Sequence, residues 1–206
     1  MLTTVYSLGR ASNVLSTIKV EVDIRDGIGI HLIGLADNHV KESLLRTITA
    51  LQSCGYKCPG KKIVINLIPS VGSVVDGSFL DLPIALGVLI ASGQIKPAAN
   101  RERDFIIAGE LGLDGSVRYS AGTSGSTIDT AVKVCGLKGC IVPFRTATEM
   151  CFTHPLAYTP GTLQEAIKIL EEKDGTNLQH LIAWKTDEWG KLVDELNERR
   201  GGYIYE

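Results

Sequence analysis

Apolar and polar residues alternate with a period of two near the start of the chain. The alternation covers residues 17–24 and is typical of a strand with one buried face. A turn at residues 25–27 leads to a second apolar segment over residues 28–35, so the pattern predicts a β-hairpin. Further apolar runs predict strands over residues 62–67, 105–111 and 140–143. Asp114 and Gly115 predict a hairpin turn after the second of these.

Between these strands, apolar residues recur at intervals of three and four, which predicts helices. The first helix begins at Asp37 or Asn38, either of which can cap it, and ends near Ser53. The other predicted helices cover residues 81–92, a segment ending near residue 136, and residues 162–172, and residues 176–200 predict one broken helix or two short ones. The order of elements predicts one α/β domain over residues 1–160, followed by a helical C-terminal extension over residues 161–206.

The apolar residues of the predicted C-terminal extension form one stripe along its helices. Two explanations of this stripe stay open, because a stripe of this kind packs on its own domain or docks a partner. Its members are Leu181, Ile182, Trp189, Leu192, Val193 and Leu196.

The composition is that of a soluble globular protein. The chain has 206 residues, of which 44% are hydrophobic and 21% charged, with a formal net charge of −2. This size allows one full core plus an appendage, and the near-neutral charge gives no reason to expect direct nucleic-acid binding. The longest apolar run, residues 82–91, is too short to span a bilayer, and the first residues lack the basic start of a signal peptide. We therefore expect a cytoplasmic protein without membrane association.

The five cysteines, an odd number, fit a reducing compartment better than a disulfide framework. Cys54 and Cys58 are four residues apart, and Cys135 and Cys140 are five apart. Zinc-binding turns commonly have about two residues between their cysteines. We therefore expect small thiols that fill gaps near turns, and no metal site.

Residues 55–62 nearly match the phosphate-binding P-loop pattern. A P-loop lies between a strand and the N-terminus of the following helix, where backbone N–H groups face the phosphate. Here the predicted helix comes first and the strand second. Lys62 also replaces the hydroxyl residue that would hold magnesium. A helix end followed by a turn explains these residues without a nucleotide.

Residues 76–87 combine a glycine turn with the start of an apolar helix. Such a junction leaves the first N–H groups of the helix without intrahelical partners, which suits a polar site. The residue at the helix entrance is Asp81, and we expect it to cap the helix. Glu110 and Asp114 lie around the next turn, and we expect them to be solvated or bonded to backbone rather than to bind a metal.

Six blocks occur in order along the chain: Val20-Glu-Val-Asp-Ile24, Ile33-Gly-Leu-Ala-Asp37, Val40-Lys-Glu-Ser43, Ile63-Val-Ile-Asn-Leu67, Asp81-Leu-Pro-Ile-Ala-Leu86 and Gly109-Glu-Leu-Gly-Leu-Asp-Gly115. In order and spacing, they closely resemble the N-terminal domain of magnesium-chelatase-like proteins of the ComM type, over residues 1–160. This resemblance implies the fold of the second domain of ribosomal protein S5, as in the proteolytic domain of Lon proteases. It also implies an AAA+ ATPase module, which normally follows this domain.

The resemblance further implies where a Lon-type peptidase would keep its serine nucleophile and its lysine base. Matching Ile84-Ala-Leu86 to the corresponding helix places Asp81 at the serine position, where a carboxylate cannot perform hydroxyl chemistry. The segment between Gly122 and Thr127, where the lysine is expected, has none. Ser78 is a weak alternative nucleophile without a nearby base. We therefore expect a degenerate site with no catalytic residue and no cofactor.

The sequence also departs from the family that it resembles. Val74-Val75-Asp76 stands where the family usually has a lysine and an acidic residue. No P-loop ATPase follows the domain within the 206 residues, so we do not expect this polypeptide to carry magnesium chelation or ATP-driven DNA branch migration. A connection to nucleic acid would be indirect, through such relatives.

These features favour a pseudoenzyme that acts as an assembly or binding module. Its partners would be a separately encoded AAA+ ATPase or further copies of the chain. Two alternatives are a residual serine peptidase that uses Ser78, and a small-molecule kinase-like protein that binds a nucleotide at the Gly/Ser-rich loop over residues 69–78. Whether a ligand binds the loop between Gly122 and Thr127 stays open.

Overall fold

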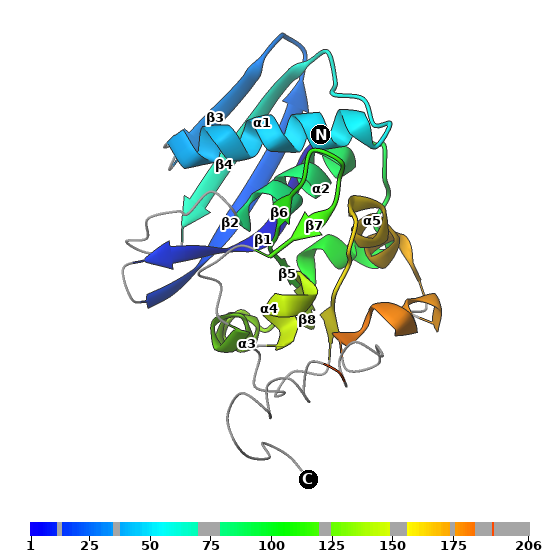
Figure 1. Cartoon of the computed structure of the whole chain (residues 1–206). Coiled ribbons are helices and arrows are strands. Elements are labelled where there is room, and N and C mark those ends of the chain that lie inside the picture. The colour runs from blue at the N-terminus through cyan, green and yellow to red at the C-terminus, as the bar shows by residue number, and fades with distance from the viewer. Residues whose placement is uncertain are drawn as a thin grey trace.

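A seven-stranded sheet runs through the described part of the chain, in the order β3-β4-β2-β1-β5-β8-β9 (Figure 1). The computed structural model describes residues 1–11, 14–34, 38–69, 79–119, 125–148, 156–173, 176–183 and residue 191. The strands of this sheet are β1 (Leu2–Ala11), β2 (Val14–Arg25), β3 (Ile30–Gly34), β4 (Lys62–Pro69), β5 (Phe105–Ile107), β8 (Gly139–Ile141) and β9 (Ala157–Tyr158). A separate hairpin consists of β6 (Glu110–Leu111) and β7 (Val117–Arg118).

The sheet is mixed. Strand β2 pairs antiparallel with β1 and with β4, whereas the β3–β4, β1–β5, β5–β8 and β8–β9 pairs are parallel. The predicted hairpin between residues 17–24 and 28–35 is therefore wrong, because β4 lies between β2 and β3. The alternation within β2 is confirmed, since Ile18, Val20 and Val22 are buried while Lys19 and Glu21 are only half-buried.

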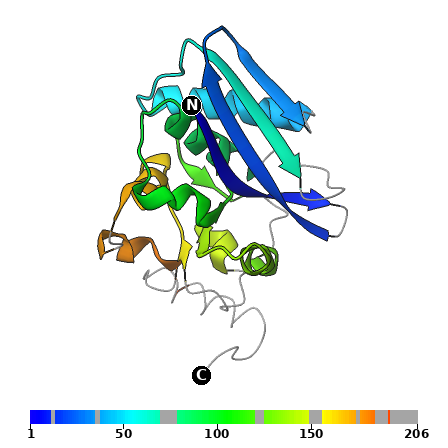
Figure 2. The same cartoon turned by 180° about the vertical axis from the view of Figure 1, so that it is seen from behind.

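The helices of the described chain are α1 (Asn38–Ser53), α2 (Asp81–Ala91), α3 (Gly125–Val134), α4 (Phe144–Thr148) and α5 (Leu163–Glu171), with 3₁₀ turns η2 (Ala98–Arg103) and η3 (Thr176–Leu181). Helices α1 and α2 lie on one face of β1 to β4, and the view from behind shows the strands in front of α1 (Figure 2). Every residue of α2 is buried. This explains why the segment is apolar on all sides rather than along one stripe.

Several predicted elements are confirmed with small changes. Helix α1 ends before Gly55, whose φ of 84° fits the left-handed position that glycine favours after a helix. The strand β4 follows, so the P-loop order is absent from residues 55–62. The predicted strand over residues 105–111 is split into β5 and β6, and the turn at Asp114 and Gly115 joins β6 to β7.

Helix α5 and the turn η3 pack into the same core as α2 and the sheet. They belong to the segment that the sequence assigns to a C-terminal extension, and most of their apolar residues are buried. Thr162 caps α5 by accepting a hydrogen bond from the Glu165 N–H at 3.2 Å. Of the predicted apolar stripe, Leu181 and Ile182 pack in this core, and the other four residues lie outside the described residues. No helix in the described ranges is long and apolar enough to cross a membrane.

Candidate functional site

Asp81 is the first residue of α2 and is fully buried, with 0% of its surface exposed. The expectation that it caps this helix is wrong. The N-cap position is Leu80, which makes no side-chain capping bond, and the carboxylate of Asp81 is bonded to other segments instead. The side chain therefore ties the start of α2 to its neighbours rather than closing the helix end.

The carboxylate of Asp81 accepts hydrogen bonds from three residues. Arg46 donates from Nε to Oδ2 at 2.8 Å and from Nη2 to Oδ1 at 3.3 Å. The hydroxyl of Ser43 donates to Oδ1. The backbone N–H of Leu111 donates to Oδ2 at 3.0 Å. A two-pronged contact from a guanidinium, plus a hydroxyl and an amide, is the arrangement expected for a buried carboxylate whose charge is balanced.

Helix α1 supplies most of these donors because of the spacing of its polar residues. Ser43, Arg46 and Thr47 are three and four residues apart, so they share the face of α1 that meets α2. Ser43 and Thr47 are fully buried on this face. Thr47 donates from Oγ1 to the backbone carbonyl of Asp81 at 3.2 Å. The helix is thus held to the first residue of α2 through both side-chain and backbone atoms.

The contacts around Asp81, called the Asp81 junction below, also include the segment between β5 and β6. The N–H of Leu82 donates to the carbonyl of Gly109 at 3.0 Å, and the N–H of Gly109 donates to the carbonyl of Phe79 at 3.1 Å. These bonds fix Gly109 beside the start of α2, which brings the N–H of Leu111 to Asp81. A side chain at Gly109 would come within 3.2 Å of Val117, so this close approach favours glycine.

The electrostatics of the junction are those of a buried ion pair. Burial raises the pKa of the Asp81 carboxyl, while the bonds from Arg46, Ser43 and the Leu111 N–H oppose that rise. The bond to Asp81 raises the pKa of Arg46, to which Glu110 and Glu42 also contribute. Only 27% of the Arg46 side chain is exposed. The guanidinium therefore interacts with the buried carboxylate of Asp81 and with the charges of Glu110 and Glu42.

This geometry holds several segments of the described chain together. A serine–carboxylate contact could in principle activate the hydroxyl, but Ser43 and Asp81 both have 0% exposure and so offer no access to a substrate. The carboxylate accepts from four donor groups in the described chain, so its lone pairs are engaged by the protein itself. Three of the six sequence blocks noted above meet here, through Ser43, Asp81 and Leu111.

The other predicted site residues are distributed differently. Ser78 and residues 120–124 lie outside the described residues, so neither the alternative nucleophile nor the first half of the loop from Gly122 to Thr127 is placed. Lys133, the first lysine after this loop, lies on α3 and pairs with Asp129 at 2.8 Å, four residues earlier on the same helix. The sequence-based assignment of a degenerate dyad therefore stays a prediction.

Glu110 and Asp114 act on different groups in the described chain. Asp114 accepts from the N–H of Ser116 at 3.0 Å and from its hydroxyl at 2.6 Å, as expected for a carboxylate in a turn. These bonds lower the pKa of Asp114. Glu110 lies on β6, where its charge acts on Arg46. Across the described ranges, no group of three or more histidine, cysteine or acidic residues is placed to hold a metal ion.

Sequence reasoning missed the role of Arg46. Its signal was present, because Ser43, Arg46 and Thr47 form a polar patch at helical spacing within a helix that otherwise presents apolar residues to the core. A buried aspartate at the start of an apolar helix requires such a partner. The two observations together could have predicted the pair of Arg46 and Asp81, although these residues lie 35 positions apart in sequence.

Comparison with known proteins places the junction inside a shared domain. A family model described as subunit ChlI of Mg-chelatase matches residues 20–146. The uncharacterized protein YifB of Escherichia coli is 39% identical over 113 residues, which cover 54% of this chain and 22% of that protein. The uncharacterized protein Rv2897c of Mycobacterium tuberculosis is 33% identical over 148 residues, which cover 66% of this chain and 28% of the relative.

Competence protein ComM of Haemophilus influenzae is a further relative, 36% identical over 115 residues, which cover 55% of this chain and 22% of that protein. The chain therefore spans about a quarter of the length of the relatives that it matches. Ser43, Arg46, Asp81 and Leu111 all lie within the segment matched by the family model.

Proposed function

The chain belongs to the family of subunit ChlI of Mg-chelatase, and we propose that it is a non-catalytic assembly module with a Lon-protease-like fold. In this proposal the fold is that of the second domain of ribosomal protein S5, and α2 is the helix at whose start a Lon-type peptidase holds its serine. The module would associate with copies of itself and with an AAA+ ATPase carried on another chain. Its activity would lie in binding and not in bond cleavage.

The buried pair of Asp81 and Arg46 carries this proposal. A serine peptidase needs an accessible hydroxyl and a base that accepts its proton. At the proposed serine position, the chain has a carboxylate with 0% exposure that is bonded to a guanidinium at 2.8 Å. Removing one member of such a pair leaves an uncompensated charge, so the arrangement supports a structural role for this position.

A chemical probe tests the absence of peptidase chemistry. An alkyl fluorophosphonate modifies activated serines, so we expect it to leave the wild-type protein unlabelled while it labels a known serine hydrolase in the same reaction. Labelling of the wild type that disappears in Ser78→Ala would reject the proposal in favour of the residual peptidase.

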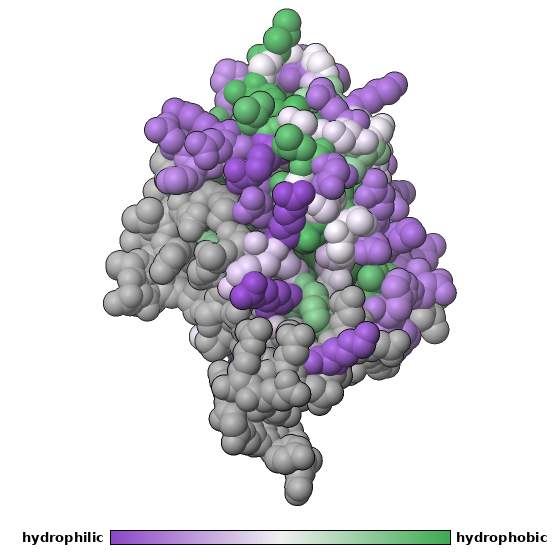
Figure 3. All heavy atoms as spheres, in the orientation of Figure 1, coloured by the Kyte–Doolittle hydropathy of each residue, from purple (hydrophilic) through white to green (hydrophobic). Residues whose placement is uncertain are grey.

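Exposed apolar side chains support an association surface beside the junction. Leu45 on α1 is 68% exposed, and Leu113 in the turn between β6 and β7 is 56% exposed. The end of α1 contacts this turn, since the Cys54 thiol lies 3.8 Å from the carbonyl of Asp114. The space-filling view shows apolar surface among polar residues on the face that carries α1 (Figure 3). In this proposal, Leu45 and Leu113 contribute to the contact surface of the module.

Sedimentation tests the association. We expect the apparent mass of the wild type to rise over about a hundredfold range of concentration, because self-association follows mass action. Leu45→Glu and Leu113→Glu should each weaken that rise. Ile28→Glu, at an 89% exposed position in the turn between β2 and β3, serves as the matched control and should not. A wild type that stays monomeric at every concentration, and does not co-sediment with an AAA+ ATPase from the same genome, contradicts the assembly role.

A further inference from the structure

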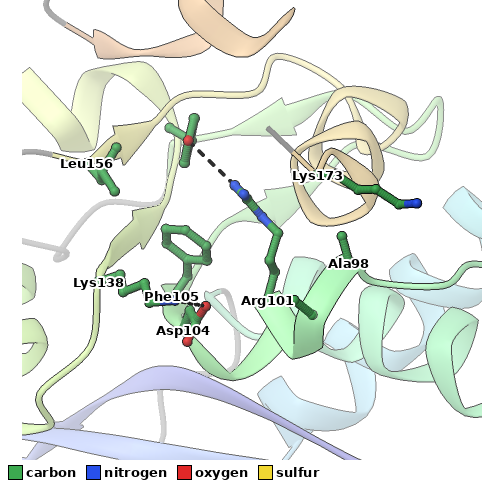
Figure 4. Close-up of a pocket in the computed structure, with 9 residues that line it drawn as sticks. Ala98, Arg101, Asp104, Phe105, Lys138, Leu156 and Lys173 are labelled. Atoms are coloured by element: carbon green, nitrogen blue, oxygen red, sulfur yellow. Dashed lines mark hydrogen bonds and ion pairs between the residues drawn. The ribbon is translucent and has the colours of Figure 1, made fainter. Parts of the chain in front are cut away.

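A pocket of about 460 Å³ lies between η2, the end of α5 and the strands β5, β8 and β9 (Figure 4). It is separate from the junction at Asp81, with which it shares no lining residue. Its charged and aromatic lining residues are Arg101, Asp104, Phe105, Lys138, Tyr158 and Lys173. Small-molecule sites commonly enclose about 300–1,000 Å³, so the volume suits a small metabolite.

Arg101 is held in this pocket by two aromatic rings. Its guanidinium carbon lies 5.4 Å from the ring centre of Phe105 and 5.9 Å from that of Tyr158. Nη2 donates to the Tyr158 hydroxyl at 3.5 Å, the contact drawn in Figure 4. The two rings are 2% and 4% exposed, respectively. Because they are covered, they fix the orientation of the guanidinium rather than offering their faces to a ligand.

The positive charge of Arg101 is not balanced by a carboxylate within the described ranges. Arg101 takes part in none of the ion pairs found among the described residues. Its buried Nε has no hydrogen-bond partner among those residues. A guanidinium whose only described hydrogen bond goes to a neutral hydroxyl retains its capacity to bind an anion.

The surrounding charges add to this positive character. Lys138 pairs with Asp104 at 2.8 Å, so these two residues compensate each other. Lys173 also lines the pocket, although its ammonium points away from Arg101 in Figure 4. The lining thus carries three cations and one carboxylate, a net charge of +2, in a protein whose formal net charge is −2. Such a local excess attracts anions.

The backbone at the edge of the pocket is strained. Ala99, which lines the pocket, has a φ of 49°, and Asn100 has a φ of 60°. Two successive residues other than glycine rarely take this left-handed conformation, which is unfavourable for alanine. The turn directly precedes Arg101, and strained backbone of this kind clusters at ligand sites.

We propose that this pocket binds a small organic phosphate, with Arg101 as the residue that recognises the phosphate group. The planar fork of arginine donates two parallel hydrogen bonds to phosphate oxygens. The net charge of +2 in the lining matches a phosphate dianion, and Lys173 contributes through its field rather than by contact. Leu156 and Ala98 provide apolar surface for the organic part of the ligand.

An NMR titration of the full chain with phenyl phosphate tests this assignment, at about pH 8 so that the phosphate is a dianion. We expect saturable shifts of the amide signals of residues 98–105 and of Tyr158. Arg101→Gln should raise the Kd by about tenfold or more, the loss expected for one charge-assisted bidentate contact. The matched control is Arg103→Gln, in the same 3₁₀ turn, whose side chain pairs with Glu102 and does not line the pocket.

A second variant and a second ligand complete the test. Lys173→Glu changes an exposed residue at the edge of the pocket, so it should fold normally and still raise the Kd by about threefold. Benzoate, a carboxylate of similar size, should bind more weakly than phenyl phosphate. Equal binding of the two anions, shifts located outside the pocket, no saturable shift, or an unchanged Kd in Arg101→Gln would each overturn the proposal.

Discussion

Asp81 joins segments that lie far apart along the chain. Its partners are 38, 35 and 30 residues away at Ser43, Arg46 and Leu111. A buried carboxylate would be costly without these donors, because transfer of a charge from water into a protein interior is strongly unfavourable. With them, a single side chain fixes how α1, α2 and the hairpin of β6 and β7 meet.

Replacement of Asp81 should therefore be strongly destabilising. Asp81→Ala removes the partner of Arg46 and leaves the buried Ser43 hydroxyl and the Leu111 N–H without their acceptor. We expect the free energy of unfolding to fall by about 3 kcal/mol, measured by urea denaturation. Asp26→Ala is the control, since Asp26 is fully exposed and its pair with Lys61 should contribute almost nothing to stability. Equal effects of the two substitutions would show that Asp81 makes no special contribution.

The reactivity of the cysteine thiols provides a second test, of which individual residues are buried. Burial raises the pKa of the Cys140 thiol to about 12, and Cys140 is 0% exposed. Cys135, only five residues earlier, is exposed. The thiolate is the reactive form, so iodoacetamide under native conditions should modify Cys135 and spare Cys140. Peptide mass spectrometry measures both sites, and unfolding in urea should make them equally reactive.

At this scale the sequence predicted the importance of Asp81 but not what the residue does. The glycine turn and apolar helix marked its position, whereas the direction of its carboxylate depends on Arg46, which arrives from another helix. Arg101 was not singled out from the sequence, because its setting needs Phe105 and Tyr158 from different strands. Contacts between residues distant in sequence follow from the tertiary fold, which local patterns do not specify.

Helix α2 packs against the sheet at a glycine. A Cβ atom at Gly87 would lie 2.7 Å from Val22 Cγ2 on β2 and 3.4 Å from Val5 Cγ2 on β1. Gly87→Ala should therefore lower the free energy of unfolding by about 2 kcal/mol, although alanine favours a helix by about 0.5–1 kcal/mol. In Gly60→Ala the new atom meets nothing within 4 Å, so the same measurement should show almost no change. A stabilised Gly87→Ala protein would mean that α2 can move away from the sheet.

Strands β2 and β4 are linked by the hydrogen bond from Asn66 to Glu21, which should respond to pH. The hydrogen bond from Lys19, and a second from Asn66, lower the pKa of Glu21 below its usual value of 4.5 despite its partial burial. A lowered pKa in the folded state contributes stability above pH 4.5, and this contribution is lost as the pH falls further. Between about pH 6 and pH 3, wild type should therefore lose up to about 1 kcal/mol more stability than Glu21→Gln. Parallel denaturation curves of both proteins at each pH measure the difference, and identical pH dependence would contradict the assignment.

The elements themselves were more predictable than their pairing. Helix α2, helix α5 and the turn at Asp114 and Gly115 follow from local patterns, and the structure confirms them. The parallel pairing of β3 with β4 could not be read from the sequence, because α1 separates the two strands and a β-hairpin fits the same local pattern. The first strand, β1, was also not predicted, because its residues form a strand through their pairing with β2.

Across the whole molecule, the family match and the packed core do not have the same extent. The family model matches residues 20–146, whereas the described core continues through α5 and η3. These two elements are joined to the remainder by backbone contacts as well as by side chains. The Val117 N–H donates to the carbonyl of Gly161 at 2.8 Å, and the Leu163 N–H donates to that of Gly115 at the same distance. The hairpin of β6 and β7 is thus held between the Asp81 junction on one side and the start of α5 on the other.

This arrangement predicts that a fragment of residues 1–160 will not fold cooperatively. The removed segment contains seven large apolar side chains that are at most 5% exposed: Leu163, Ile167, Ile169, Leu170, Leu178, Leu181 and Ile182. Each contributes about 1.5–3 kcal/mol when buried, as an upper estimate, so the sum is comparable with the about 5–15 kcal/mol that stabilises a typical domain. A fragment of residues 1–183 retains all of these contacts and should unfold in one sharp transition. Circular dichroism during heating distinguishes the two, and a sharp transition in the shorter fragment would show that the first 160 residues form an independent domain.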